Sequence, residues 1–298
     1  RTTPAGIVKR TMIDRIDPMK SRRTISTRGA EHRYASQTIT PVILAVMLCA
    51  VGAVFADDAD HPKDKSKETL TDPAAIAILE KVDKATKAVK SVRYEGHFSA
   101  SGFGAAHLPH ARGTAVIRGN LEDKFEYYFD VKIYRDNQPT DERLTTGGNG
   151  DRFFFIDWRH MTAHEGNRER IIGTAGQKAK WFLTMIEFIH PSPFTQEIEG
   201  NRIEMKDSAL VGDVDCHVIH VVYGINGQEA TWYFGKEDHL PRRVIRSFPV
   251  MDGDRVVRDR SVLNLEVDPD LPDTLFQLQL PEGFRKTNKP APNENIPR

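Results

Sequence analysis

The sequence has very little cysteine and no excess of charge of either sign. Only two of its 298 residues are cysteines, which excludes a scaffold held by several disulfides and a zinc site with four thiolate ligands. The 42 lysines and arginines equal the 42 aspartates and glutamates, so the basic composition typical of a nucleic-acid-binding protein is missing. Hydrophobic residues make up 39% of the chain, enough for one large domain or two small ones.

The overall balance of charge hides a division of the chain near residue 56. Residues 41–55 carry no charge, basic side chains precede them, and Asp57 and Asp58 follow them closely. A basic start, a short apolar run and a small residue at its end are typical of a secretory signal peptide. A membrane-spanning helix needs about 20 apolar residues, and this run is shorter. We predict a leader and signal peptide over residues 1–56, cleavage after Ala56 and a periplasmic location; an uncleaved membrane anchor is the alternative.

Removal of this leader changes the charge and the cysteine content of the protein. The leader contains nine basic and three acidic residues, so 33 basic and 39 acidic residues remain and the mature protein is mildly acidic. Cys216 is then the sole cysteine, which excludes an internal disulfide. We interpret Cys216 as a buried, inert thiol, because it lies beside Val218 and no activating neighbour is visible in the sequence.

After Ala56 the pattern predicts one helix followed by a long series of strands. Residues 57–71 are polar and predict a flexible tether. A helix then starts at Asp72 and Pro73 and continues with apolar residues at helical spacing to about Lys90. Beyond it, apolar and polar residues alternate, which predicts strands. The strand segments are 92–98, 114–118, 125–134, 143–146, 152–158, 160–164, 201–206, 215–223, 230–234, 242–248 and 255–267.

A second helix interrupts this series of strands. Residues 175–189 lack the alternation and have helical spacing, and Pro191 and Pro193 stop the helix. An antiparallel sheet of roughly ten strands curls on itself. We therefore predict an α+β domain over residues 72–286, with a large curled antiparallel sheet (a half-open β-barrel) and helices capping one opening. Such a sheet encloses a ligand cavity. Residues 287–298 predict a disordered tail.

Four motifs in a fixed order carry a resemblance to a known family. They are the strand 211–219 with Gly212 at its start, the Trp-Tyr-Phe strand 231–234, the Leu-Pro-Arg-Arg-Val segment 240–244 and the closing segment 275–284. In these motifs the chain resembles the bacterial outer-membrane lipoprotein carrier (LolA/LolB-like) superfamily, nearest to its uncharacterised predicted periplasmic proteins. The resemblance implies a half-open barrel capped by helices with an apolar cavity for acyl chains, and it supplies no catalytic residue.

Aromatic residues at alternating positions, together with apolar residues of the second helix, are the candidates for the lining of this cavity. Ordinary core packing uses the same residue types and is the alternative. Arg242 and Arg243 are candidates for a polar mouth, because neighbouring strand residues point to opposite faces and an arginine binds a carboxylate or headgroup well. A solvated arginine pair is the alternative. The candidate lining residues are Phe125, Tyr127, Phe129, Phe153, Phe155, Trp181, Met185 and Phe188.

The histidines do not form a recognisable metal site. His217 and His220 are three residues apart and so point to opposite faces of a strand, while His160 and His164 give two ligands where zinc needs three or four. The sequence also lacks a nucleophile elbow and a complete glycine-rich nucleotide loop. We predict no metal, no cofactor and no catalytic residue.

Three functional hypotheses remain. The first is an exported, non-catalytic binding protein for lipid, lipidated protein or another apolar ligand, with an envelope protein as a further partner and no nucleic acid. The second is an envelope interaction or sensing module with a filled barrel. The third is a metal-dependent hydrolase.

Overall fold

The computed structural model describes residues 71–105, 108–135, 138–167, 171, 175–224, 227–250 and 253–287. The chain divides into two units, Arg1–Asp64 and Lys65–Arg298, and the described residues all belong to the second. The predicted signal peptide, most of the predicted tether and the tail after Thr287 lie outside the described residues.

Helix α1 (Pro73–Ala88) begins where the sequence predicts it. The Asp72 carboxylate accepts a hydrogen bond from the backbone N–H of Ala74 at 2.9 Å, and Pro73 occupies the first turn, where no backbone donor is needed. Leu79 and Val82 are completely buried against the sheet. The helix is therefore defined at its start by capping and along its length by burial of one face.

The strands of the described residues form one sheet of twelve, in the order β12-β6-β5-β4-β3-β2-β1-β11-β10-β9-β8-β7. Two antiparallel meanders, β1 to β6 and β7 to β11, meet where β1 pairs with β11, and the short β12 pairs in parallel with β6. The sheet is curled and unclosed, so the α+β half-open barrel predicted from the sequence is confirmed. The strands are β1 (Ser91–Gly102), β2 (His110–Arg118), β3 (Glu126–Arg135), β4 (Gln138–Gly148), β5 (Phe153–Asp157), β6 (Thr162–Gly166), β7 (Arg202–Val211), β8 (Val214–Val222), β9 (Glu229–Gly235), β10 (Pro241–Pro249), β11 (Arg255–Val267) and β12 (Arg285–Lys286).

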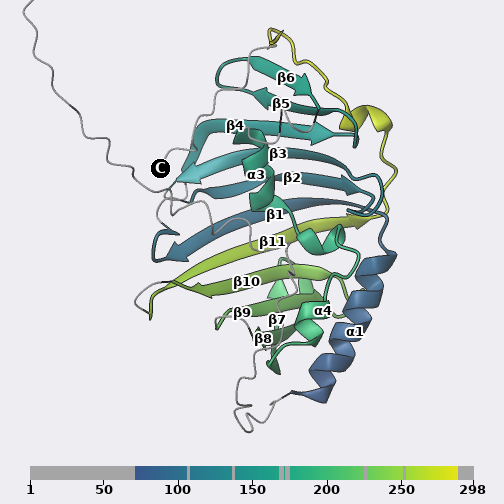
Figure 1. Cartoon of the computed structure of the whole chain (residues 1–298), viewed down its shortest axis with the longest axis vertical. Helices are drawn as coiled ribbons and strands as arrows, with labels where there is room; N and C mark the ends of the chain where they lie inside the picture. The colour runs from purple at the N-terminus through teal and green to yellow at the C-terminus, as the bar shows by residue number, and fades with distance from the viewer. Residues whose placement is uncertain are drawn as a thin grey trace, which may run out of the picture. The chain divides into compact units, whose positions relative to one another are not determined.

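The helices pack on one face of this sheet, which we call the concave face (Figure 1). Helix α3 (Ala175–Leu183) lies over β1 to β5, while α1 and the short α4 (Thr195–Ile198) lie at the β7 end. The side chains of Tyr94, Phe129, Val244 and Val262 belong to this face and to one continuous hydrophobic core. The hydrophobic core therefore lies between the sheet and its helices.

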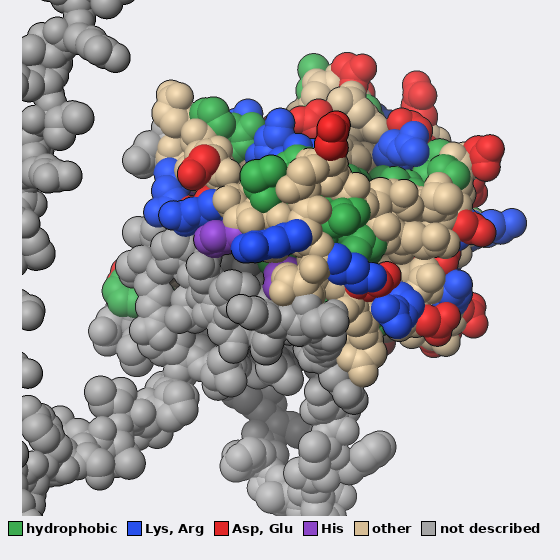
Figure 2. All heavy atoms as spheres, turned by 90° about the horizontal axis from the view of Figure 1, so that it is seen from above, with side chains coloured by type: hydrophobic (Ala, Val, Ile, Leu, Met, Phe, Trp, Pro, Cys, Tyr) green, Lys and Arg blue, Asp and Glu red, His purple; other side chains and the backbone are tan. Residues whose placement is uncertain are grey.

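The opposite, outer face is partly covered by the segment that follows β11. This segment contains the 3-10 turn η5 (Asp273–Phe276), and Phe276 packs with Val116 and Leu271. Farther along, Leu278 and Phe284 pack on Phe154 of β5. Seen from above in Figure 2, basic and acidic side chains are interspersed over the described surface. No helix among the described residues has the length and apolar character needed to cross a membrane.

Two sequence-based element predictions are wrong in detail. The predicted strand 160–164 is a turn up to Met161, because the Asp157 carboxylate accepts the backbone N–H of His160 at 3.0 Å, and β6 starts only at Thr162. The predicted single helix 175–189 is divided into α3 and the 3-10 turn η3 (Ile186–Phe188). Met185 between them is extended, with φ −82° and ψ 97°, which ends the first helix.

Candidate functional site

The candidate site is the concave face together with the segment that covers it. We call residues 175–190, which contain α3 and η3, the cover. Its buried side chains pack on aromatic residues of β1: the rings of Phe182 and Phe98 are 4.9 Å apart, and those of Phe188 and Tyr94 are 6.0 Å apart. Leu183 is completely buried against the same strand. The contact between cover and sheet is therefore mainly apolar.

Tyr94 of β1 ties the break in the cover to the sheet. Its hydroxyl donates a hydrogen bond to the Leu183 carbonyl at 2.9 Å and accepts one from the backbone N–H of Met185 at 3.0 Å. Burial raises the pKa of Tyr94, so the hydroxyl keeps its proton. One side chain thus satisfies two backbone groups that the end of α3 leaves without helical partners.

Arg260 of β11 binds the carboxyl end of α3. Its Nε donates to the Phe182 carbonyl and its Nη2 donates to the Trp181 carbonyl, each at 2.9 Å. A cation at this end of a helix also interacts favourably with the helix dipole. Burial lowers the pKa of Arg260 to about 10, so the guanidinium is still charged at neutral pH.

A third polar anchor joins the cover to β10. Arg246 donates to the carboxylate of Glu187 at 2.9 Å and lies 3.6 Å from that of Glu197, and both glutamates are only 3% exposed. The hydroxyl of Tyr223 donates to Glu197 at 2.7 Å and accepts from the indole N–H of Trp232 at 3.4 Å. The cover is therefore held by a connected polar network as well as by apolar packing.

Replacing Tyr94 by Phe should loosen the cover. The change leaves the Leu183 carbonyl and the Met185 N–H unpaired in a buried place, so we expect a loss of about 1–3 kcal/mol in the free energy of unfolding. Hydrogen exchange should also become faster over 183–188. Tyr233→Phe is the matched control, because the Tyr233 hydroxyl has no hydrogen bond with the described residues. Equal exchange in the two variants would show that Tyr94 does not hold the cover.

Glu197 should make the stability of the protein depend on pH. Burial raises its pKa above the usual 4.5, against the opposing effect of Arg246. The folded state therefore holds this proton more tightly than the unfolded state, and stability is lost as pH rises from about 4.5 through the raised pKa. Glu197→Gln removes this term and still accepts from Tyr223. Urea unfolding at pH 4, 5.5 and 7 measures the effect. The free energy of unfolding of the variant, relative to that of the original protein, should increase as pH rises. A relative value that stays constant or decreases would contradict this.

Most of the predicted lining residues lie on the concave face, where they are packed into the core. Trp181 is the exception, because it is 49% exposed on the outer side of α3. Phe155 is buried on the same face but stacks on His164, with ring centroids 6.0 Å apart, beside the main core cluster. The residues that belong to the main core or pack against it are Phe125, Tyr127, Phe129, Phe153, Met185 and Phe188.

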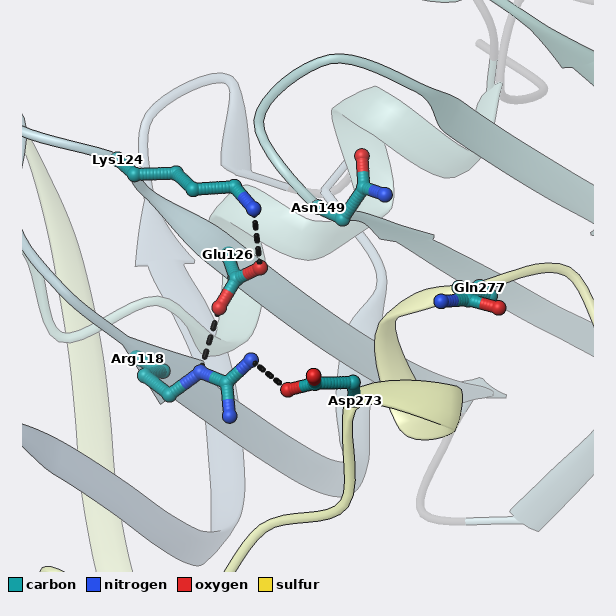
Figure 3. Close-up of a pocket in the computed structure, with 6 residues that line it drawn as sticks. All are labelled: Arg118, Lys124, Glu126, Asn149, Asp273 and Gln277. Atoms are coloured by element: carbon teal, nitrogen blue, oxygen red, sulfur yellow. Dashed lines mark hydrogen bonds and ion pairs between the residues drawn. The ribbon is translucent and has the colours of Figure 1, made fainter.

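Two pockets lie on the outer face, beside the segment around η5. The first has a volume of about 190 Å³ and the second about 230 Å³, below the range of about 300–1,000 Å³ usual for ligand sites. Figure 3 shows that the charged groups of the first pocket are paired with one another: Arg118 lies between Glu126 and Asp273, and Lys124 also contacts Glu126. We therefore place the candidate site on the concave face and not in these pockets.

Arg242 and Arg243, the predicted polar mouth, are each paired with a carboxylate of their own. Arg242 is buried against Asp238 and also donates to the Leu240 carbonyl at 3.3 Å, at an irregularity in the pairing of β10 with β9. Arg243 binds Asp259 of the neighbouring strand through two nitrogens. The arginines that face the cover are others, which sequence reasoning missed: Arg246 and Arg260, with Arg258 beside them.

The remaining candidates, Cys216, His217 and His220, lie on β8. Cys216 is buried, and burial raises the pKa of its thiol to about 11, as expected of an inert cysteine. His217 stacks on His239, whereas His220 contacts Thr231 on the other side of the strand. Within the part of the chain that the structure describes, no group of three or more His, Cys, Asp and Glu residues is arranged to hold a metal ion.

The comparisons with known proteins concern the fold. Neither a protein-family model nor a curated protein sequence matches this chain. Among solved structures, LprF from Mycobacterium bovis is similar with a TM-score of 0.43 and 12% identity, over 68% of this chain and 98% of that one. Lipoprotein LppX from Mycobacterium tuberculosis gives a TM-score of 0.41 and 12% identity, over 68% and 99%. A LolA superfamily protein from Nitrosomonas europaea has a TM-score of 0.29 and 14% identity, over 68% of this chain and 97% of that one.

One of these structures is a LolA superfamily protein, and the motifs of this sequence resemble the same superfamily. At identities of 12–14% the likeness concerns the fold alone.

Proposed function

We propose that this protein is an exported, non-catalytic binding protein that receives lipid, lipidated protein or another apolar ligand on the concave face of its sheet. The observation that carries the proposal is the way the cover is attached. Apolar side chains of the cover rest on an aromatic surface, and a few side-chain bonds to its backbone, from Tyr94 and Arg260, hold it there. An acyl chain has the same chemistry as the side chains it would replace.

The energies of such an exchange are of comparable size. A chain of about 16 carbons gains roughly 12 kcal/mol on leaving water, at about 0.8 kcal/mol for each methylene. Releasing the two hydrogen bonds of Tyr94 to the cover costs about 2 kcal/mol, and releasing the three from the charged Arg246 and Arg260, at about 1.5–3 kcal/mol each, costs about 4.5–9 kcal/mol more. If the cover moves aside with its apolar side chains still resting on the ligand, the exchange is favourable. The predicted lining residues, Tyr127 and Phe129 among them, would then contact the ligand.

A titration with a fluorescent fatty acid tests this proposal. The mature protein should increase the emission of dansyl-undecanoic acid in a saturable way, and oleate should displace the probe. Hydrogen exchange over 175–190 should rise when oleate is bound, because the cover has left its anchors. A titration without saturation and without displacement by oleate would refute the proposal.

A filled barrel that serves as an envelope interaction or sensing module is the second candidate. It is favoured by one specific observation: Phe129 and Met185 are completely buried in the described structure, so the concave face is occupied by the protein itself. This alternative predicts no acyl binding and a partner recovered by crosslinking in the native envelope. The titration above therefore separates the two candidates.

A further inference from the structure

Three arginines lie on the concave face, next to the cover. Arg246 of β10 lies two residues after the core residue Val244. Arg258 and Arg260 of β11 lie an even number of residues before the core residue Val262. All three arginines therefore point to the same face of the sheet as these valines. Arg246 is directly opposite Arg258 in the antiparallel pair, and Arg260 follows two residues later. Like charges directly opposite each other on neighbouring strands destabilise a sheet. Their presence on an otherwise apolar face therefore needs a compensating interaction.

The described carboxylates do not balance these three charges. Glu187 and Glu197 both lie against Arg246, and Glu187 also interacts with Arg260, so two carboxylates face three arginines. Arg260 binds neutral carbonyl groups. The positive charge on the face therefore exceeds the negative charge among the described residues.

Arg258 is the least satisfied of the three. Its buried Nε has no hydrogen-bond acceptor in the described structure, and its guanidinium lies over the ring of Phe248, 5.2 Å from the centroid. Burial lowers the pKa of Arg258, and no neighbouring carboxylate offsets this effect. A buried donor without an acceptor costs about 1–3 kcal/mol, and more when the donor is charged. A guanidinium offers several donors in the planar arrangement that suits a carboxylate or a phosphate.

We propose that the apolar ligand carries an anionic headgroup, a carboxylate or a phosphate, which Arg258 binds together with Arg246 and Arg260 while the chain lies on the aromatic part of the concave face. This inference rests on the proposed function and names the class of its ligand. The headgroup would supply the acceptor that Arg258 lacks. Its negative charge would also offset the repulsion between the two positive charges of Arg246 and Arg258, which face each other across the strand pair.

Displacement of the neutral probe N-phenyl-1-naphthylamine by palmitate and by hexadecanol tests the headgroup. The two compounds share a chain length and differ in the charge of the head. Palmitate should bind at least roughly tenfold more tightly, the effect of one good hydrogen bond to a charged group. Equal affinities would overturn the headgroup and leave the proposed function standing, whereas no binding of the probe or of either compound would refute both.

Two variants show whether Arg258 is responsible. In Arg258→Gln the ratio of the affinity for palmitate to that for hexadecanol should fall to nearly one, while the affinity for hexadecanol stays unchanged. In Arg243→Gln, on the outer face, this ratio should stay as it is. An equal loss of both ligands in Arg258→Gln would assign the residue a structural role and overturn the proposal. The palmitate–hexadecanol comparison in the unmodified protein needs no variant, so a folding defect in Arg258→Gln does not remove the test.

Phosphate-bearing competitors distinguish a lipid headgroup from a free ion. Dipalmitoyl phosphatidic acid should displace the probe, and inorganic phosphate at the same concentration should not. If inorganic phosphate abolishes the difference in affinity between palmitate and hexadecanol, the proposed headgroup site is overturned and the arginines bind a free anion instead.

Discussion

Trp232→Ala should lower the free energy of unfolding by about 3–5 kcal/mol, the range for truncating a large buried aromatic residue. Trp232 is completely buried on the concave face. Its ring meets that of Phe194 edge-on at 5.1 Å and stacks on Phe234 at 5.7 Å, so it joins α4 to β9. The substitution also removes the donor to Tyr223. Urea unfolding at pH 7, monitored by circular dichroism, measures the loss.

Trp181→Ala is the matched control for this prediction. It removes the same atoms from a tryptophan that is 49% exposed on α3, and surface substitutions of this kind change stability by about 0.5 kcal/mol. A similar loss of stability in both variants would show that the concave face is not the main core of the protein.

A disulfide between the cover and the sheet should abolish ligand binding. Gly96 of β1 faces Leu183 of α3, and a Cβ placed at Gly96 would lie 3.0 Å from the Leu183 Cβ. Cystines need about 3.5–4.5 Å, so Gly96→Cys with Leu183→Cys requires an adjustment of only about half an ångström. If the ligand enters only when the cover moves, the oxidised protein should bind the fluorescent fatty acid at least about 100-fold more weakly, since the open state is no longer populated.

Reduction of the same sample is the internal control for the disulfide. The reduced double variant should bind far more tightly than the oxidised one, because only the link between cover and sheet differs between the two forms. A Cys216→Ala background removes the one other cysteine of the described chain, which is buried. Binding that is equally tight in the oxidised and reduced forms would show that the cover does not have to move.

Much of the sheet could be predicted from local sequence, because apolar and polar residues alternate within the strand segments between Val92 and Val267 on both sides of the helical segment 175–198. The start of α1 could be predicted for the same reason, since Asp72 and Pro73 are a local signal. The break in the predicted helix 175–189 could not. It lies where the Tyr94 hydroxyl binds the backbone of Met185, a contact between residues 91 positions apart. Such a contact leaves no trace in the periodicity of the helix itself.

Sequence alternation could predict which apolar residues share the concave face, but not which charged residues lie there. Alternation placed Tyr127 and Phe129 together on one face, and the structure does the same. Arg242 and Arg243 are candidates because neighbouring strand residues point to opposite faces, yet each has its own carboxylate in the structure. The charged residues of the concave face come together only through the register of β10 on β11. The sequence signal that could have found them is an arginine an even number of residues from a buried valine of the same strand, because such residues point to the same face.

Native mass spectrometry of the protein isolated from its own envelope tests the central proposal most directly. The proposed function predicts a mature chain that starts at Asp57 and carries a bound acyl-containing species, which is released on collisional activation and can be replaced by palmitate. Detection of the unliganded chain alone, both as isolated and after incubation with excess palmitate, would contradict it.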